Sequence, residues 1–275
     1  MAKYLFFALF CFGLLLCAPA SATVYSTEFI ANGDFSEGLA GWDCYLAYDL
    51  SDENGQACPD SIIKQEDDIY YIDMSSSEYH YVVLMQDIIV PSDIGKLTGS
   101  FDYLFDTTNI TGDSYFQFKL SNTDTDKELV SEVYNFQSGS LGTWTGYEKN
   151  LNAYAGQTLQ VMYIIYNDSI QESTSALVKN ISMFGKSYPS LRGVVKERNN
   201  ETGQIKKIKG AKVRLRTPGN TLLWKGKTKK KGKFTAKNVR GYKKKARIII
   251  RHKGEKKVFR RKIKWGVEYK YIFWI

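Results

Sequence analysis

The chain has 275 residues, with 38 Lys and Arg against 29 Asp and Glu and a formal net charge of +9. This length is enough for two domains of ordinary size. Only two histidines occur, His80 and His252, and no nucleophile elbow, His-Glu-x-x-His helix or phosphate-binding glycine loop is present. These absences argue against the common hydrolases, zinc proteases and nucleotide-dependent enzymes, so we predict no catalytic residues and no enzyme activity.

The first 22 residues have the pattern of a signal peptide. Lys3 precedes an almost wholly apolar run from Tyr4 to Cys17, and Ala20-Ser21-Ala22 then supplies small residues at a cleavage site. The alternative is a transmembrane anchor, but the run is shorter than the roughly 20 residues that a spanning helix needs. We therefore expect cleavage near Ala22, export to an extracellular or periplasmic location, and no transmembrane segment after cleavage.

Charge divides the chain into two parts of opposite sign. Residues 1–187 contain eight lysines, no arginine and 25 acidic residues, a net charge of −17, whereas residues 188–275 contain 30 basic and four acidic residues, a net charge of +26. Such an asymmetry indicates a domain boundary, and Pro189 with its small neighbours supplies a linker signal beside it. The predicted organisation is a signal peptide at 1–22, an acidic domain at 23–185 and a basic domain at 186–275.

The acidic part reads as a β-rich domain with little helix. Short aromatic-rich and β-branched runs alternate with turn signals, and no window shows a 3.6-residue apolar period. The runs that we interpret as strands are 69–74, 79–89, 97–105, 115–120, 129–136, 158–166 and 176–184. Their even spacing is typical of a β-sandwich.

Two cysteines, Cys44 and Cys58, remain after removal of the signal peptide. In an exported protein such a pair is expected to form a disulfide. Two free thiols or a metal site are the alternatives, and the lack of a nearby histidine or further cysteine argues against the metal site.

The start of the acidic part resembles galactose-binding-like jelly rolls, including several carbohydrate-binding modules. The resemblance begins with the segments 30–36 (IANGDFS) and 37–42 (EGLAGW), in which Phe35 can plug the sandwich and Trp42 can cap it. It continues through 84–91, 99–103, 142–157 and 173–178. A jelly-roll fold is what this resemblance implies.

The resemblance also implies what the family often has, a structural calcium, and what it sometimes has, a sugar site. Aromatic side chains in loops at the end of a sandwich suit sugar stacking, and the candidate ligand-binding residues are Tyr45, Tyr48, Trp144 and Tyr147. Cross-strand packing is the alternative role for each aromatic residue. Glu28 is the candidate calcium ligand, but Lys179 and Asn180 stand where the family commonly has two aspartates. We therefore expect no obligatory cofactor.

The basic part resembles the carboxypeptidase-regulatory-like family, whose members are small transthyretin-like sandwiches. The matching segments are 191–195 (LRGVV), 201–203 (ETG), 208–213 (IKGAKV) and 228–234 (TKKKGKF). About seven strands are expected, and the alternation at 212–216 places Val213 and Leu215 inward and their basic neighbours outward. The predicted fold class is thus all-β, a jelly-roll sandwich followed by a smaller seven-stranded transthyretin-like sandwich.

The density of positive charge separates this second domain from an inert spacer. A charge of this size favours a polyanionic partner, since self-repulsion otherwise costs folding free energy. The candidate polyanion-binding residues are Lys229, Lys230, Lys231, Lys243, Lys244, Lys245, Lys256, Lys257, Arg260 and Arg261. No motif for reading a nucleic-acid sequence occurs, so we do not expect sequence-specific nucleic-acid binding.

Two functions remain from the sequence. The first is a secreted, non-catalytic adhesion protein with a glycan-binding jelly roll and a cationic module that contacts an anionic polysaccharide or matrix. The alternative is a structural protein of the cell envelope or of an extracellular filament, which associates with acidic proteins or with itself through its two oppositely charged modules.

Overall fold

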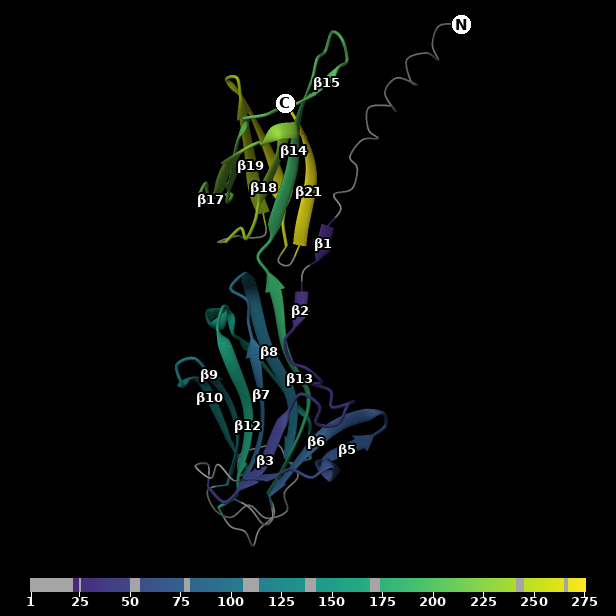
Figure 1. Ribbon diagram of the computed structural model, residues 1–275, viewed down its shortest axis with the longest axis vertical. Helices are drawn as coiled ribbons and strands as arrows, with labels where there is room; N and C mark the ends of the chain where they lie inside the picture. Colours follow the sequence, from purple (N-terminus) through teal and green to yellow (C-terminus); the bar gives the residue numbers. More distant parts are fainter. Residues whose placement is uncertain are drawn as a thin grey trace, which may run out of the picture. The chain divides into compact units, whose positions relative to one another are not determined.

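The computed structural model describes residues 22–24, 26–49, 55–76, 80–105, 114–136, 142–168, 174–240, 245–264 and 267–275. The described chain is built from β-strands joined by turns and three-residue 3-10 helices (Figure 1). The prediction of an all-β sandwich fold is confirmed. None of its described helices is long and apolar enough to cross a membrane. Apart from Ala22, the predicted signal peptide lies outside the described residues.

The described chain forms two compact units. The first unit comprises residues 26–186, and the second comprises residues 187–275 together with β1 (Ala22–Val24). β1 pairs antiparallel with β21 (Val267–Trp274), from Ala22 opposite Tyr269 to Val24 opposite Val267. The segment beside the predicted cleavage site therefore adds to a sheet of the second unit, although the sequence placed it at the start of the first domain.

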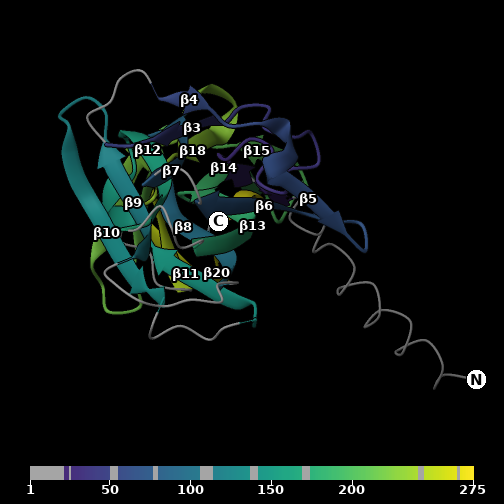
Figure 2. The same ribbon diagram turned by 90° about the horizontal axis from the view of Figure 1, so that it is seen from below.

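Two antiparallel sheets form the first unit, and Figure 2 shows their strands in two layers. Sheet 1 has the order β10 (Lys127–Asn135), β9 (Tyr115–Asn122), β12 (Thr158–Tyr166), β7 (Tyr81–Ile89), β3 (Asp43–Ala47) and β4 (Gln56–Ala57). Sheet 2 has the order β11 (Thr145–Asn150), β8 (Ile94–Phe105), β13 (Thr174–Ser187), β6 (Ile69–Ser76) and β5 (Ile63–Glu66), and β2 (Ser26–Glu28) pairs with β13.

The core of the first unit lies between these sheets because each strand turns alternate residues inward. β9 alternates strictly, with Phe116, Phe118 and Leu120 buried and their neighbours partly exposed. Tyr163 of β12 meets Phe101 of β8 edge to face, with 5.0 Å between ring centroids. Such aromatic contacts add to the burial of apolar area.

The opening segment of the first unit seals this core. Phe35 is fully buried, and the nearly buried Trp42 donates a hydrogen bond from Nε1 to the Asn32 carbonyl at 3.1 Å. The predicted packing roles of both residues are confirmed. Gly33 lies so close to β13 that a Cβ atom there would stand 1.8 Å from the Ile181 carbonyl oxygen, so a side chain at this position cannot be accommodated.

The predicted disulfide between Cys44 and Cys58 is confirmed. It joins β3 to the residue that follows β4, and both half-cystines pack against the core of the first unit. The backbone N–H of Cys58 also donates to the Cys44 carbonyl at 3.1 Å. The free-thiol and metal alternatives are thereby removed.

The second unit is a smaller sandwich of two sheets. Sheet 3 has the order β1, β21, β14 (Ser190–Arg198) and β15 (Ile205–Lys207), with β18 (Lys233–Ala236) also paired to β14. Sheet 4 has the order β17 (Leu222–Lys227), β16 (Lys212–Arg216), β19 (Lys245–His252) and β20 (Glu255–Lys262). Residues 190–274 thus hold eight described strands, because Ile205–Lys207 forms a short, exposed strand that its sequence did not suggest. The transthyretin-like likeness remains a prediction.

Candidate functional site

A row of tyrosines crosses the outer side of sheet 1. In the strand register Tyr115 of β9 stands opposite Tyr166 of β12, which stands opposite Tyr81 of β7. Their neighbours along each strand point into the core, so these three rings face away from it. Ring centroids are 5.1 Å apart for Tyr115 and Tyr166 and 5.0 Å apart for Tyr166 and Tyr81. We call these three residues the tyrosine row.

Hydrogen bonds at the strand ends hold this row in place. The backbone N–H of Asn167 donates to the His80 carbonyl at 2.8 Å, and His80 Nδ1 lies 2.7 Å from the Asn167 carbonyl. Ser114 Oγ, which precedes β9, donates to the Asp168 carboxylate at 3.0 Å. The His80 ring also stacks on Tyr166, with 6.3 Å between centroids. The ends of three neighbouring strands are therefore tied together, and the tyrosine row lies on a fixed support.

The surroundings of Tyr81 and Tyr115 favour the protonated form of their hydroxyl groups. Burial raises the pKa of Tyr81 above its usual value, and Tyr115, Tyr166 and the Asp49 carboxylate raise it further. Burial and then Tyr166 raise the pKa of Tyr115. Neutral phenols can both donate and accept hydrogen bonds, which suits them to the hydroxyl groups of a polar ligand.

An apolar strip and a polar rim continue this side of the sheet. Val83 and Ile164, opposite one another beside the tyrosine row, are only 0% and 1% exposed although they point outward. Met85 and Met162 form the next cross-strand pair. Beyond them Gln160 Nε2 donates to the Asp87 carboxylate at 3.1 Å, and Lys119 pairs with Glu128 at 3.5 Å.

The four predicted sugar-binding residues do not form one site. Tyr45 lies on the outer side of sheet 1, opposite Val83 and close against Gly55, and Tyr48 follows the same strand with 59% of its surface exposed. Tyr147 of β11 faces the core instead and stacks on Phe101, with ring centroids 4.7 Å apart. Tyr147 is therefore a packing residue.

Trp144 lies on the other sheet and is already covered by protein. The Lys179 ammonium stands 3.8 Å from the Trp144 ring centroid, and Tyr71 contacts the same ring edge-on at 6.0 Å. A cation over the indole face is a favourable contact, and it occupies the surface on which a sugar ring would stack. Sequence alone could not reveal this, because Lys179 and Trp144 are 35 positions apart.

The surroundings of Glu28 do not fit a calcium site. Its Oε1 accepts hydrogen bonds from the backbone N–H groups of Phe29, Ile30 and Met183, and its Oε2 accepts one from Ser182 Oγ. These donors use the lone pairs that a cation would need. Lys179 does not replace the cation there, since it lies over Trp144. Across the residues that the structure describes, no group of three or more His, Cys, Asp or Glu is placed to hold a metal ion.

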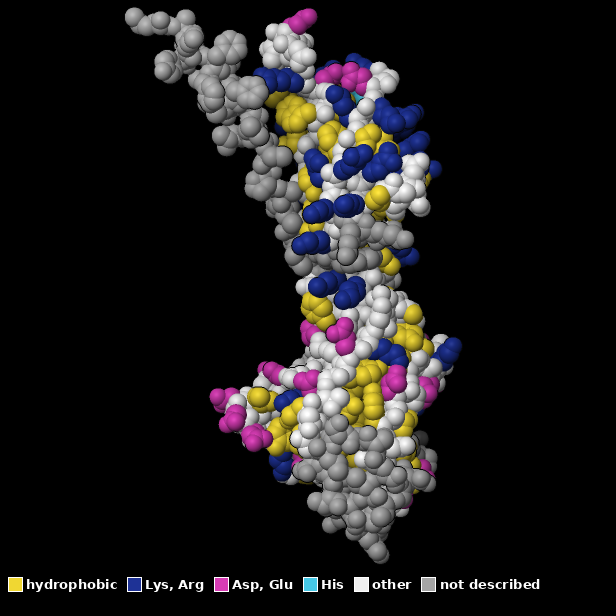
Figure 3. Space-filling model, turned by 180° about the vertical axis from the view of Figure 1, so that it is seen from behind, with side chains coloured by type: hydrophobic (Ala, Val, Ile, Leu, Met, Phe, Trp, Pro, Cys, Tyr) yellow, Lys and Arg dark blue, Asp and Glu magenta, His cyan; other side chains and the backbone are white. Residues whose placement is uncertain are grey.

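The outer side of sheet 4 is densely cationic. Val213, Leu215, Ile248 and Ile250 are buried in the core of the second unit, which confirms the predicted inward positions of Val213 and Leu215 and turns the alternate residues outward. We call this outer side the arginine face. Its basic residues are Lys212, Arg214, Arg216, Lys225, Lys227, Lys245, Arg247, Arg251, Lys256, Arg260 and Lys262. Figure 3 shows Lys and Arg side chains over one face of the second unit.

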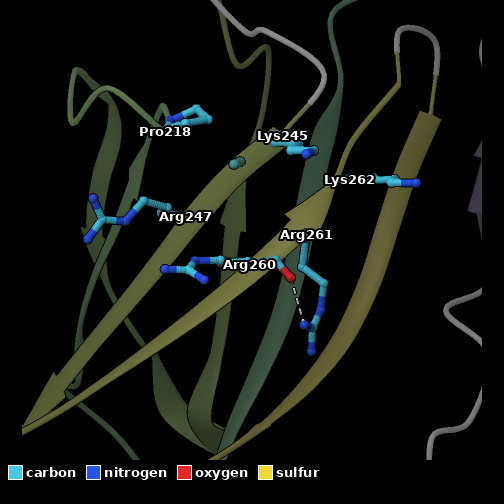
Figure 4. A pocket seen from close by; sticks show the side chains of 7 residues that line it. Pro218, Lys245, Arg247, Arg260, Arg261 and Lys262 are labelled. Carbon is cyan, nitrogen blue, oxygen red and sulfur yellow. Dashed lines mark hydrogen bonds between the residues drawn. The ribbon is translucent and has the colours of Figure 1, made fainter.

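Three hollows lie along this face. The first has a volume of about 550 Å³ (Figure 4). It is lined by Pro218, Lys245, Ala246, Arg247, Arg260, Arg261 and Lys262. The second and third share Arg214, Ile249 and Arg251. Figure 4 shows the side chains of Arg247 and Arg260 extending in the same direction from neighbouring strands.

The predicted polyanion-binding residues divide among several places. Lys245, Lys256 and Arg260 lie on the arginine face, whereas Lys229, Lys230 and Lys231 lie beside β18 in the hairpin that η4 (Lys230–Gly232) forms. Arg261 turns away, lies over the rings of Tyr271 and Phe259, and donates from Nη1 to the Arg260 carbonyl. Lys257 has the same orientation as Arg261 on its strand. Lys243 and Lys244 lie outside the described residues.

The predicted site residues leave out most members of the arginine face and all three members of the tyrosine row. Arg214, Arg216, Arg247 and Arg251 are scattered between β16 and β19, and only the strand register brings them together. The alternation of apolar and basic residues at 212–216 could have identified Arg214 and Arg216, two of these four. The tyrosine row has no such signal, because its three members come from three strands.

No protein-family model matches this sequence, and no curated protein matches it. Solved structures do resemble it. One is TmCBM61 in complex with β-1,4-galactotriose, with a TM-score of 0.40, 15% identity, and coverage of 58% of this chain and 99% of that chain. A second is the Family 11 carbohydrate-binding module from Clostridium thermocellum in complex with a β-1,3-1,4-mixed-linked tetrasaccharide, with a TM-score of 0.35, 15% identity, and coverage of 58% and 95%. A third is the K3 cleaved adhesin domain of Lys-gingipain from Porphyromonas gingivalis w83, with a TM-score of 0.37, 14% identity, and coverage of 58% and 99%. At these identities and TM-scores, the likenesses carry no inference about what this chain binds.

Proposed function

We propose that this chain is a secreted, non-catalytic binding protein, with a glycan site on the outer side of sheet 1 and a second unit that contacts an anionic polysaccharide or matrix. The observation that carries the glycan site is the tyrosine row, three neighbouring and partly exposed rings from adjacent strands. The apolar faces of pyranose rings stack on aromatic rings, and the hydroxyl groups at the edges of the sugar form hydrogen bonds with polar side chains.

The rest of sheet 1 supports the same function. Tyr45, Met85 and Met162 extend the apolar surface beside the row, and the amide of Gln160 and the carboxylate of Asp87 supply hydrogen-bond partners at its end. Sites for small polar ligands commonly combine an apolar floor with a few placed polar groups. The raised pKa values of Tyr81 and Tyr115 keep these phenols neutral, so they can bind the hydroxyl groups of an uncharged glycan.

The test is glycan-array binding of the mature chain, from Thr23 onward. Wild type should bind a defined set of neutral glycans, and Tyr166→Ala should weaken binding about tenfold or more, since a stacking ring contributes on the order of 1–3 kcal/mol. Tyr71→Ala is the matched control. Tyr71 is a partly buried tyrosine on the outer side of sheet 2, and its loss should leave binding unchanged.

Two results would count against the glycan site. One is wild-type chain that binds no neutral glycan with or without calcium. The other is an equal loss in Tyr166→Ala and Tyr71→Ala, which would place any binding elsewhere or trace it to damage to the sandwich. Thermal unfolding of each variant separates the two causes of an equal loss.

A further inference from the structure

We propose that the arginine face binds a linear polysaccharide that carries sulfate or carboxylate groups, with the arginines binding the anionic groups and the sugar rings lying over Val258. This inference rests on the polyanion contact in the proposed function and assigns it to particular residues. It concerns sheet 4 alone and is independent of the glycan site on sheet 1.

The charge on this face has no counter-charge beside it. Among the described residues of the outer side of sheet 4, eleven are basic and none is acidic. The acids of the second unit lie elsewhere: Glu268 is buried and paired with Arg192, and Glu197 and Glu201 belong to β14 and the turn after it. Glu255 pairs with His252 and points to the opposite side of the sheet from Lys256. The face therefore attracts anions without internal competition.

The strand register arranges the basic residues in rows. Arg216, Arg247 and Arg260 stand side by side across three strands, and Lys212, Arg251 and Lys256 form a second such row. Neighbouring strands are about 4.8 Å apart, and the four positions from Arg247 to Arg251 span about 13 Å. Each row can thus contact closely spaced anionic groups, and the two rows can contact separate sugars of one polymer.

An apolar centre lies between the two rows. Ile249 of β19 is only 7% exposed, and it stands opposite Val258 of β20, which has 42% of its surface exposed. Arg214 flanks Ile249 on the other side. Val258 thus offers an apolar surface between the cations, on which the apolar face of a sugar ring can lie.

One arginine on this face lacks a partner. The Nε atom of Arg247 is buried and, within the described residues, has no hydrogen-bond acceptor. A buried donor without an acceptor destabilises the folded protein. Arg247 lines two of the hollows, beside Arg260 in one and Arg214 in the other. An oxyanion bound in either hollow would accept hydrogen bonds from the Arg247 guanidinium in the bidentate manner for which such groups are suited.

The chemistry of the face favours a polysaccharide over single-stranded nucleic acid. Base recognition without sequence preference uses exposed aromatic rings as stacking platforms. The aromatic residues of sheet 4 point the other way: Trp224 stacks on Phe234, with 6.1 Å between centroids, and Phe259 contacts Phe273 at 4.9 Å. None of the described outward residues of the arginine face is aromatic.

The test measures the affinity of the mature chain for heparin, a sulfated probe, and for hyaluronan, a carboxylate probe, over a range of salt concentrations. The face variant is Arg214→Gln/Arg247→Gln/Arg260→Gln. Its matched control, Lys229→Gln/Lys230→Gln/Lys233→Gln, removes the same three charges from exposed positions around the η4 hairpin. We expect about 100-fold weaker binding for the face variant and less than about threefold for the control, with the salt slope falling by about one per lost contact.

A second variant tests whether the guanidinium group matters apart from its positive charge. Arg214→Lys/Arg260→Lys keeps the net charge, and because it leaves the partly buried Arg247 in place, we expect it to fold like wild type. We expect it to bind about tenfold more weakly than wild type. Binding equal to wild type would overturn the role of the guanidinium groups.

The remaining outcomes each decide one point. Equal weakening in the face variant and the hairpin control would overturn the assignment to the arginine face while leaving polyanion contact intact. No binding of either probe by wild type at physiological salt would overturn the polyanion part of the proposed function itself, with the glycan-array result unaffected. Tighter binding of duplex DNA than of both polysaccharides, at equal salt, would replace the polysaccharide with nucleic acid.

Discussion

Tyr163 is the largest side chain that is fully buried in the chain's described residues, and it is also an acid. Burial raises its pKa well above the usual value, and the nearby Tyr147 raises it further. Below about pH 10 the phenol is protonated in both the folded and the unfolded chain. Above that pH only the unfolded chain loses the proton, so the free energy of unfolding falls as the pH rises.

We therefore expect Tyr163→Phe to reduce the alkaline loss of stability. The wild-type free energy of unfolding should fall more steeply above about pH 10 than that of the variant, by up to about 1.4 kcal/mol per pH unit. Urea unfolding at a series of alkaline pH values measures both slopes. Tyr48→Phe, at an exposed position, is the control and should match wild type. Identical slopes for Tyr163→Phe and wild type would contradict the expectation.

Single residues also show what the sequence could predict about function. Phe35 and Trp42 were identified correctly as packing residues, because their spacing with glycines belongs to a local motif. Trp144 and Tyr147 were assigned to a sugar site because aromatic side chains suit that role. Whether a ring is covered, as Trp144 is by Lys179, depends on a strand far away in the sequence. The local motif thus predicted the packing of Phe35 and Trp42, whereas no local pattern showed which of the other rings would be covered by distant strands.

At the scale of elements, the Cys44–Cys58 disulfide closes a loop with a sequence separation of 14 residues around β4. A cross-link of this length lowers the entropy of the unfolded chain by an amount equivalent to about 3 kcal/mol. Cys44→Ser/Cys58→Ser should lose about 2–3 kcal/mol from the first unit, measured by chemical unfolding. Reductant should produce the same loss in wild type and none in the variant. An unchanged wild-type midpoint under reducing conditions would contradict this.

The strands themselves were predictable where they are buried. The runs at 115–120, 158–166 and 69–74 correspond to β9, β12 and β6, all of which contribute to the core. β3 and β11 were missed. β11 is an edge strand whose residues (TGYEKN) include one core contact, Tyr147, and β3 is five residues long. Edge strands bury little apolar surface, so their sequences lack the alternation that identifies a strand.

Both candidate surfaces depend on strand register, which no sequence pattern fixed. The tyrosine row requires β9, β12 and β7 to be neighbours, although β7 and β12 are separated by some 70 residues. The arginine face requires β16 to pair with β19. The sequence shows that tyrosines and arginines are present, but only the pairing of distant strands brings them together on one surface.

For the whole molecule, the dominant feature is the opposite charge of its two parts, −17 over residues 1–187 and +26 over residues 188–275. Two copies can therefore attract one another head to tail, and such a contact does not close on itself. The attraction reaches about 30 Å at 0.01 M salt and about 8 Å at physiological salt. Association between copies of this protein should therefore depend on ionic strength.

We expect the average mass of the mature chain in light scattering to rise with protein concentration at about 0.01 M salt and to return to that of a monomer at about 0.15 M. Heparin oligosaccharides should abolish the low-salt association, because they occupy the arginine face that the acidic unit of a second copy would contact. The Arg214→Gln/Arg247→Gln/Arg260→Gln variant should associate less than wild type without any oligosaccharide. A monomer at every ionic strength would contradict association between copies. Association that persists at high salt would mean that it depends on contacts other than charge.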